Sequence, residues 1–192
     1  MRNRRFTFPV LTVFLLAGAC GGAQDESAAD AAAAGEATGA TAQPASMTET
    51  PTPEERAAID QVIAITEKFK DIEAAKTAGY TDQTPTGCLS SAEGAQGIHY
   101  LNPTLADAQV ELLTPEMVMY EPQADGSMTL VGVDYIIPFD RWTAAEPPTL
   151  QGRPLMRNET YSVWALHIWT VRENPNGMFA PWNPNVSCQN AR

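Results

Sequence analysis

The sequence lacks every compact motif that would name a reaction. It contains no Gly-x-Ser-x-Gly elbow, no CxxC or CxxCH pair, no HExxH helix and no glycine-rich phosphate loop. Histidine occurs only twice and cysteine only three times. The sequence therefore lacks the usual signatures of serine hydrolases, haem attachment and zinc peptidases. A function must be inferred from residues that are far apart in the sequence.

Basic residues are also scarce. The chain has 12 Lys and Arg against 23 Asp and Glu, which gives a net charge of -11. Arg2, Arg4 and Arg5 precede Cys20, whereas every acidic residue follows it, so cleavage before Cys20 leaves a net charge of -14. Nucleic-acid binding needs clustered basic residues, so no nucleic-acid partner is expected. The carboxylates provide solubility and some capacity for divalent cations.

A hydrophobic run long enough to span a bilayer is missing. The apolar stretch 6–16 is too short for that purpose and follows the basic residues 1–5, a pattern typical of a bacterial signal peptide over residues 1–19. Residues 16–20 (LAGAC) resemble the lipobox of bacterial lipoproteins, in which the cysteine is diacylated. We therefore expect an exported protein with a lipid anchor at Cys20, directed to the outer membrane if the host is Gram-negative. An ordinary secretory cleavage site is the alternative.

The chain then divides into a tether and a domain. Residues 20–50 hold no Lys, Arg, aromatic or branched aliphatic residue, so they are predicted to form a disordered Ala/Gly-rich tether behind the acylated cysteine. Residues 51–192 have the length of a single domain.

The domain begins with a helix signal. Thr52 is a suitable N-cap, Pro53 suits the first helical position, and Gly79 is a natural C-terminal stop. Apolar residues recur between these points at helical spacing: Ala58, Ile59, Val62, Ile63, Ile65, Phe69, Ile72 and Ala75. The spacing predicts one amphipathic helix over residues 53–78.

Strand patterns follow the helix. Residues 116–121 and 128–137 flank a turn at 122–126 that ends in Asp-Gly, which indicates a β-hairpin. Residues 161–171 predict a further strand, and the proline-rich segment 145–154 predicts a loop. The fold class is therefore predicted as α+β, with an N-terminal amphipathic helix packed on an antiparallel sheet, long irregular loops and one disulfide. Cystatin-like curvature and a small sandwich both suit this pattern.

The disulfide is expected between Cys88 and Cys188. They are the only cysteines besides Cys20, and an exported protein meets an oxidising compartment. Closing a loop of this length contributes on the order of 4 to 5 kcal/mol in the chain-entropy model. The bond would also bring the segments of the two histidines into one neighbourhood.

The two histidines are the candidate site. On a strand, His167 shares a face with Val163 and Ala165, and His99 points away from Ile98 and Tyr100. With a carboxylate from Glu121 or Asp134, the two imidazoles can form a divalent metal site or an acid/base cluster. Alternatively, each imidazole makes one structural hydrogen bond at a half-buried face. The spacing identifies no catalytic residue and no definite cofactor.

Aromatic residues offer a second feature. Tyr100, Trp169 and Trp182 are candidates for lining an apolar pocket, because aromatic rings stack on flat ligands and sugars. Trp164 is assigned to the core. Asn and Pro crowd the loop over residues 174–185, where they favour turns first.

Several segments together resemble a family of uncharacterised bacterial secreted proteins and lipoproteins. They are residues 88–103 (CLSSAEGAQGIHYLNP), 119–123 (MYEPQ), 130–135 (LVGVDY), 166–169 (LHIW) and 174–188 (NPNGMFAPWNPNVSC). In that family GxHY, LHxW and NPxGxFxxWNPxVSC recur, and both histidines and the Cys88 and Cys188 pair fall within these segments. The resemblance implies a shared envelope domain with no associated activity, and it draws attention to His99 and His167.

Three functional hypotheses follow. The first is a small-ligand or metal-binding accessory module in the cell envelope. The second is a structural or protein-interaction domain that docks through its aromatic loop. The third is a hydrolase-type enzyme that uses His99 and His167. The binding hypothesis requires both imidazoles close to one point in a concave site, whereas the interaction hypothesis requires an exposed apolar patch.

Overall fold

The computed structural model of this chain describes residues 49–85 and 87–192. The predicted signal peptide, the lipidation site Cys20 and residues 21–48 of the predicted tether lie outside the described residues. Across the described ranges, no helix has both the length and the apolar character that crossing a bilayer requires.

The N-terminal helical segment comprises three short helices: α1 (Pro53–Thr66), the 3-10 helix η1 (Glu67–Lys70) and α2 (Ile72–Thr77). Its start agrees with the sequence, because Thr52 and Glu55 form a capping box in which each side chain accepts the other's backbone N–H. The prediction of one continuous helix over 53–78 is wrong. The chain is extended at Asp71, whose carboxylate caps α2 by accepting a hydrogen bond from the Glu73 amide.

The break has a geometric reason. At 3.6 residues per turn, Ala75 would lie about 160° around a straight helix from Ile59, so one face could not bury both. In the structure both belong to the same core cluster. The change of direction is anchored by Tyr120, whose hydroxyl donates to the Phe69 carbonyl oxygen (2.7 Å).

A six-stranded antiparallel sheet forms the rest of the framework. Its spatial order is β1 (Cys88–Ser91), β2 (Gly94–Leu101), β3 (Met117–Pro122), β4 (Met128–Pro138), β8 (Val163–Ile168) and β7 (Met156–Asn158). The predicted hairpin is confirmed as β3 and β4, and the predicted strand 161–171 corresponds to the shorter β8. The predicted loop 145–154 instead contains a small hairpin of β5 (Thr149–Leu150) and β6 (Arg153–Pro154). A 3-10 turn, η2 (Phe139–Arg141), follows β4.

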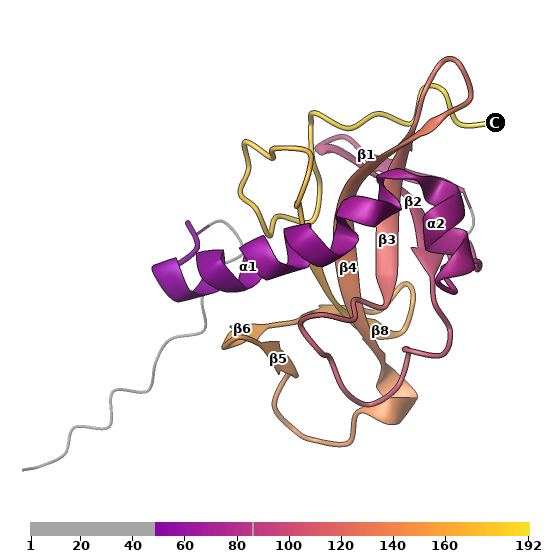
Figure 1. Cartoon of the computed structure of the whole chain (residues 1–192). Coiled ribbons are helices and arrows are strands. Elements are labelled where there is room, and N and C mark those ends of the chain that lie inside the picture. The colour runs from indigo at the N-terminus through magenta and orange to yellow at the C-terminus, as the bar shows by residue number, and fades with distance from the viewer. Residues whose placement is uncertain (1–48, 86) are drawn as a thin grey trace, which may run out of the picture. The chain divides into compact units, whose positions relative to one another are not determined.

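The two faces of the sheet differ in character. Figure 1 shows α1 lying across the sheet, and the helical residues Val62 and Phe69 pack there with Tyr120, Tyr135 and Leu166 of the strands. The opposite face carries a smaller apolar cluster of Leu101, Met117, Ile136 and Ala165. Strand alternation therefore separates a helix-covered core from a second face, and this second face carries the candidate site.

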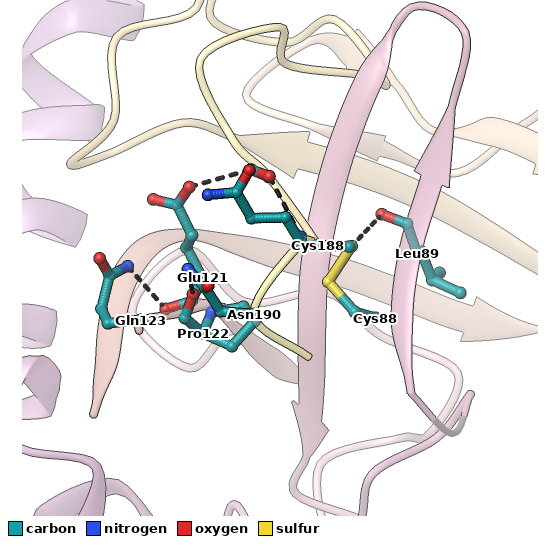
Figure 2. Close-up of a disulfide and its surroundings, with 9 residues drawn as sticks. Cys88, Leu89, Glu121, Pro122, Gln123, Cys188 and Asn190 are labelled. Atoms are coloured by element: carbon teal, nitrogen blue, oxygen red, sulfur yellow. Dashed lines mark hydrogen bonds between the residues drawn. A yellow bond between two sulfur atoms is a disulfide. The ribbon is translucent and has the colours of Figure 1, made fainter. Parts of the chain in front are cut away.

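The C-terminal segment is fastened back onto the sheet. Cys88 at the start of β1 forms the predicted disulfide with Cys188 (Figure 2). Next to it, the Glu121 carboxylate accepts hydrogen bonds from the Ser187 amide (2.9 Å) and the Arg172 guanidinium (2.6 Å). The α+β class with one disulfide is thus confirmed.

Candidate functional site

Three strands bring the titratable residues together on the second face of the sheet. His99 comes from β2, Asp134 from β4 and His167 from β8. Asp134 and His167 are direct partners in the antiparallel register. His99 is paired with Met119 of the intervening strand, so its side chain reaches toward Asp134 over β3. The sheet register, rather than the disulfide, assembles the two histidines.

The three side chains converge closely. The Asp134 Oδ2 atom lies 3.7 Å from His99 Nε2 and 3.5 Å from His167 Nε2. One donor atom from each residue lies within 4.8 Å of the others, an arrangement that could hold a metal ion. All three residues are buried, with exposed fractions of 2% for His99, 4% for Asp134 and 8% for His167.

Despite this proximity, much of the hydrogen-bonding capacity of the cluster is not used. His99 Nδ1, Asp134 Oδ1 and His167 Nε2 are buried without a hydrogen-bond partner among the described residues. The distances between the imidazoles and the carboxylate exceed the 2.9 to 3.0 Å usual for N–H···O bonds. Buried polar groups are nearly always paired, and an unsatisfied one costs about 1 to 3 kcal/mol. The cluster therefore lowers stability, and packing alone does not account for it.

Burial also controls the charge of these groups. Desolvation, with a smaller electrostatic effect of His167, lowers the pKa of His99 to about 3. Desolvation raises the pKa of Asp134, and His167 and the backbone amides of Leu166 and Tyr135 partly oppose that change. His99 is therefore neutral at physiological pH, and a neutral imidazole is the form that donates a lone pair to a metal.

The cluster borders a pocket of about 400 Å³. Most of its wall is apolar, and six lining residues outside the cluster are polar or charged: Thr84, Gln96, Asp140, Asn158, Tyr161 and Ser162. The lining residues are Thr84, Pro85, Leu89, Gln96, His99, Leu101, Ala106, Met117, Asp134, Ile136, Pro138, Asp140, Asn158, Tyr161, Ser162, Val163, Ala165 and His167. A volume of this size is in the range of small-molecule sites.

Other residues singled out in the sequence lie elsewhere. Glu121 is engaged by Arg172 and Ser187 rather than by the histidines. Tyr100 belongs to the core under the helices, where its hydroxyl accepts a hydrogen bond from the Gln83 amide (2.8 Å). Of the two carboxylates considered for the site, only Asp134 joins the imidazoles.

The tryptophans do not line this pocket either. Trp169 is buried beside His167 with nearly parallel rings, 6.4 Å between centroids, and its indole N–H donates to the Ala180 carbonyl oxygen. Trp182 is partly buried, and its carbonyl oxygen accepts a hydrogen bond from the Asn174 side chain. Trp164 packs against the core as expected.

The aromatic loop, residues 169–188 after β8, buries Trp169 and Phe179 and leaves Trp182 partly buried. Trp169 and Phe179 are 2% and 3% exposed, and Asn183 is fully buried. None of the exposed large hydrophobic residues of the described chain lies within residues 174–185; they are Leu113, Met156, Tyr161 and Val171. These positions give no support to docking through the aromatic loop.

The apolar wall of the pocket was not anticipated from the sequence. Side chains two positions apart on a strand point to the same face. Leu101, Ile136 and Ala165 are each two positions from a cluster residue on their own strand. Met117 is two positions from Met119, the register partner of His99, so it lies on that face as well. The sequence signal for this wall was the alternation of side chains between the two faces of a strand in residues 132–138 and 163–167. That signal identifies a shared face only once the pairing of the strands is known.

Neither a protein-family model, nor a curated protein, nor a solved structure matches this chain. The resemblance to bacterial secreted proteins and lipoproteins therefore stays a prediction.

Proposed function

We propose that this protein binds a divalent transition metal through His99, Asp134 and His167, as a binding module of the bacterial cell envelope. The supporting observation is the convergence of three buried donor groups that make no hydrogen bonds with one another. A metal ion between Asp134 Oδ2 and the two Nε2 atoms would give the unpaired His167 Nε2 a partner and would compensate the buried negative charge of the carboxylate.

The donor distances are compatible with coordination. Ligand atoms about 2.0 to 2.1 Å from a tetrahedral metal are about 3.3 Å apart. The two separations that involve the Asp134 oxygen, 3.5 and 3.7 Å, exceed this value by only a few tenths of an ångström, and no two of the three donor atoms are more than 4.8 Å apart. Two imidazoles and one carboxylate suit Zn²⁺, Fe²⁺ or Cu²⁺, whereas Ca²⁺ and Mg²⁺ prefer oxygen ligands.

Calorimetry on the full chain tests this proposal. After treatment with EDTA and its removal, we expect one equivalent of Zn²⁺ to bind, with much weaker binding of Ca²⁺. Asp134→Asn should weaken Zn²⁺ binding at least tenfold. The matched control is Glu121→Gln, which changes a buried carboxylate outside the cluster. Equal zinc affinity for wild type and Asp134→Asn would refute the assignment.

The envelope location belongs to the same proposal. The Cys88–Cys188 disulfide supports export, because such bonds persist in oxidising compartments. Metabolic labelling of a bacterial host with a fatty acid tests the anchor: the wild-type chain should carry the label, and Cys20→Ala should not. Labelling of both chains, or of neither, would contradict lipidation at Cys20.

A further inference from the structure

The register of β4 and β8 determines the order in which residues line the pocket along the strands. Successive pairs on its face are Asp134 with His167, Ile136 with Ala165, and Pro138 with Val163. Val163 and His167 are four positions apart, which corresponds to about 13 Å along a strand. The pocket therefore has the metal-ligand cluster toward one end and apolar rows leading away from it.

The apolar rows continue onto the neighbouring strands. Met117 of β3 pairs with Asp134 and with Leu101 of β2, so both side chains lie beside the cluster. These two residues and Ile136 and Ala165 form one buried apolar group. Asn158 pairs with Val163, and the polar residues Asp140, Tyr161 and Ser162 lie beyond that row; all four line the pocket. An occupant would thus meet donor atoms at the cluster, hydrocarbon in the middle of the pocket and polar groups at the far end.

Charge restricts the occupant further. Among the lining residues that the structure describes there is no Lys or Arg. A divalent ion coordinated by two imidazole lone pairs and the Asp134 carboxylate retains one positive charge, while the other carboxylate of the lining, Asp140, is exposed to solvent. One monoanionic oxygen group would neutralise it, which matters because a net charge is costly in apolar surroundings. The metal would be the only cation available to such a group inside the described lining.

Coordination chemistry leaves room for that group. Three protein ligands leave at least one position open on a tetrahedral metal, as in catalytic zinc sites. All three residues rise from the same face of the sheet and line the pocket, so a further ligand of a metal held there would approach from the pocket side. A ligand entering along the apolar rows would reach the metal with its terminal group.

We infer that the pocket binds an elongated amphipathic small molecule whose anionic oxygen head completes the coordination of the metal and whose apolar body lies along Leu101, Met117, Ile136 and Ala165. This inference rests on the proposed metal site. At about 30 Å³ for each non-hydrogen atom, taking liquid water as the guide, a pocket of 400 Å³ holds roughly a dozen such atoms. Medium-chain acyl compounds with a chelating head have this size and shape.

Three probes separate the contributions of head and body. Octanohydroxamic acid has both, acetohydroxamic acid has only the chelating head, and octanol has only the chain. Each is titrated calorimetrically into the full chain carrying one equivalent of Zn²⁺, and again after EDTA treatment. With zinc, octanohydroxamic acid should bind at least tenfold more tightly than acetohydroxamic acid. EDTA should abolish the binding of both, and octanol should bind weakly in either state.

A variant locates the apolar body without touching the metal ligands. Ala165→Leu places extra hydrocarbon in the middle of the pocket, so it should reduce the advantage of octanohydroxamic acid over acetohydroxamic acid at least fivefold while zinc affinity stays the same. Val171→Leu, at an exposed position outside the pocket, is the control.

The outcomes distinguish this inference from the metal proposal. Normal zinc binding with equal affinity for both hydroxamic acids would overturn the amphipathic ligand and leave the metal site standing. Octanohydroxamic acid binding that survives EDTA would also overturn it, because the head would not need the metal. Failure to bind zinc at all would overturn both.

Discussion

Asp134 and His167 face each other directly across β4 and β8, yet their nearest side-chain atoms are 3.5 Å apart and form no hydrogen bond. With His99 at 3.7 Å on the other side, the carboxylate is buried between two imidazoles that it does not pair with. An arrangement of this kind lowers stability, and functional sites are where such a cost is usually found.

Asp134→Asn should therefore stabilise the metal-free protein while removing its response to zinc. The substitution removes a negative charge that burial disfavours while it keeps the shape of the side chain, so in EDTA we expect the free energy of unfolding to rise by about 1 to 2 kcal/mol. Zinc should raise the unfolding midpoint of wild type and leave that of the variant unchanged. Urea denaturation with and without zinc measures both effects. A variant less stable than wild type in EDTA would show that the carboxylate has a structural role.

The sequence predicted only some of the residues that form this site. Strand periodicity correctly indicated the side of β8 on which His167 lies and the side of β2 on which His99 lies. It could not choose between Glu121 and Asp134, because that choice depends on pairing between strands. The β3–β4 ladder shifts register between Met119 and Tyr120, and no local pattern announces such a shift.

The helical segment shows a similar limit. Its capping box was visible in the sequence, since Thr52 and Glu55 act locally. The break at Asp71 was not visible in the sequence, because it depends on a tertiary contact. The Phe69 carbonyl oxygen accepts a hydrogen bond from Tyr120, which lies on a strand some fifty residues later. Local signals predicted the element and its start, whereas contacts distant in sequence determined its course.

Copper should quench the fluorescence of one tryptophan. The ring of Trp169 lies 6.4 Å from that of His167 and is nearly parallel to it, so Cu²⁺ bound at His167 would be close enough to quench the indole strongly. We expect a saturable loss of emission at one equivalent of Cu²⁺. Trp169→Phe should have lower initial emission and lose most of the quenching while still binding copper in calorimetry. Undiminished quenching in that variant would place the copper near another tryptophan.

Removal of the disulfide should affect stability more than metal binding. The Cys88–Cys188 bond closes a segment with a sequence separation of 100, and replacing both residues by serine should lower the unfolding free energy by about 2 to 5 kcal/mol. The histidines are held by strand pairing rather than by this bond. Zinc affinity should therefore change less than threefold at a temperature where the variant remains folded, as verified by circular dichroism. A much larger loss of affinity would mean that the bond positions the site.

Glu116 should make stability depend on pH. It is 2% exposed, and its carboxylate accepts a hydrogen bond from the Ile136 amide (3.0 Å). Burial raises the pKa of Glu116 from 4.5 to about 8. The negative charges of Asp134 and Asp107 add to this rise, whereas hydrogen bonds from the backbone amides of Ile136 and of Glu116 itself oppose it.

The sign of the effect follows from this raised pKa. Above pH 4.5 the unfolded chain releases the proton of Glu116 while the folded chain retains it, so the stability contributed by this group falls as pH rises toward 8 and then levels off. The loss is on the order of 5 kcal/mol, because a tenfold difference in proton affinity between the folded and unfolded chain corresponds to about 1.4 kcal/mol. Glu116→Gln keeps an acceptor for the Ile136 amide and has no proton to release. Urea denaturation from pH 5 to pH 8 should show a smaller decline for Glu116→Gln than for wild type, and parallel declines would mean that Glu116 ionises normally in the folded protein.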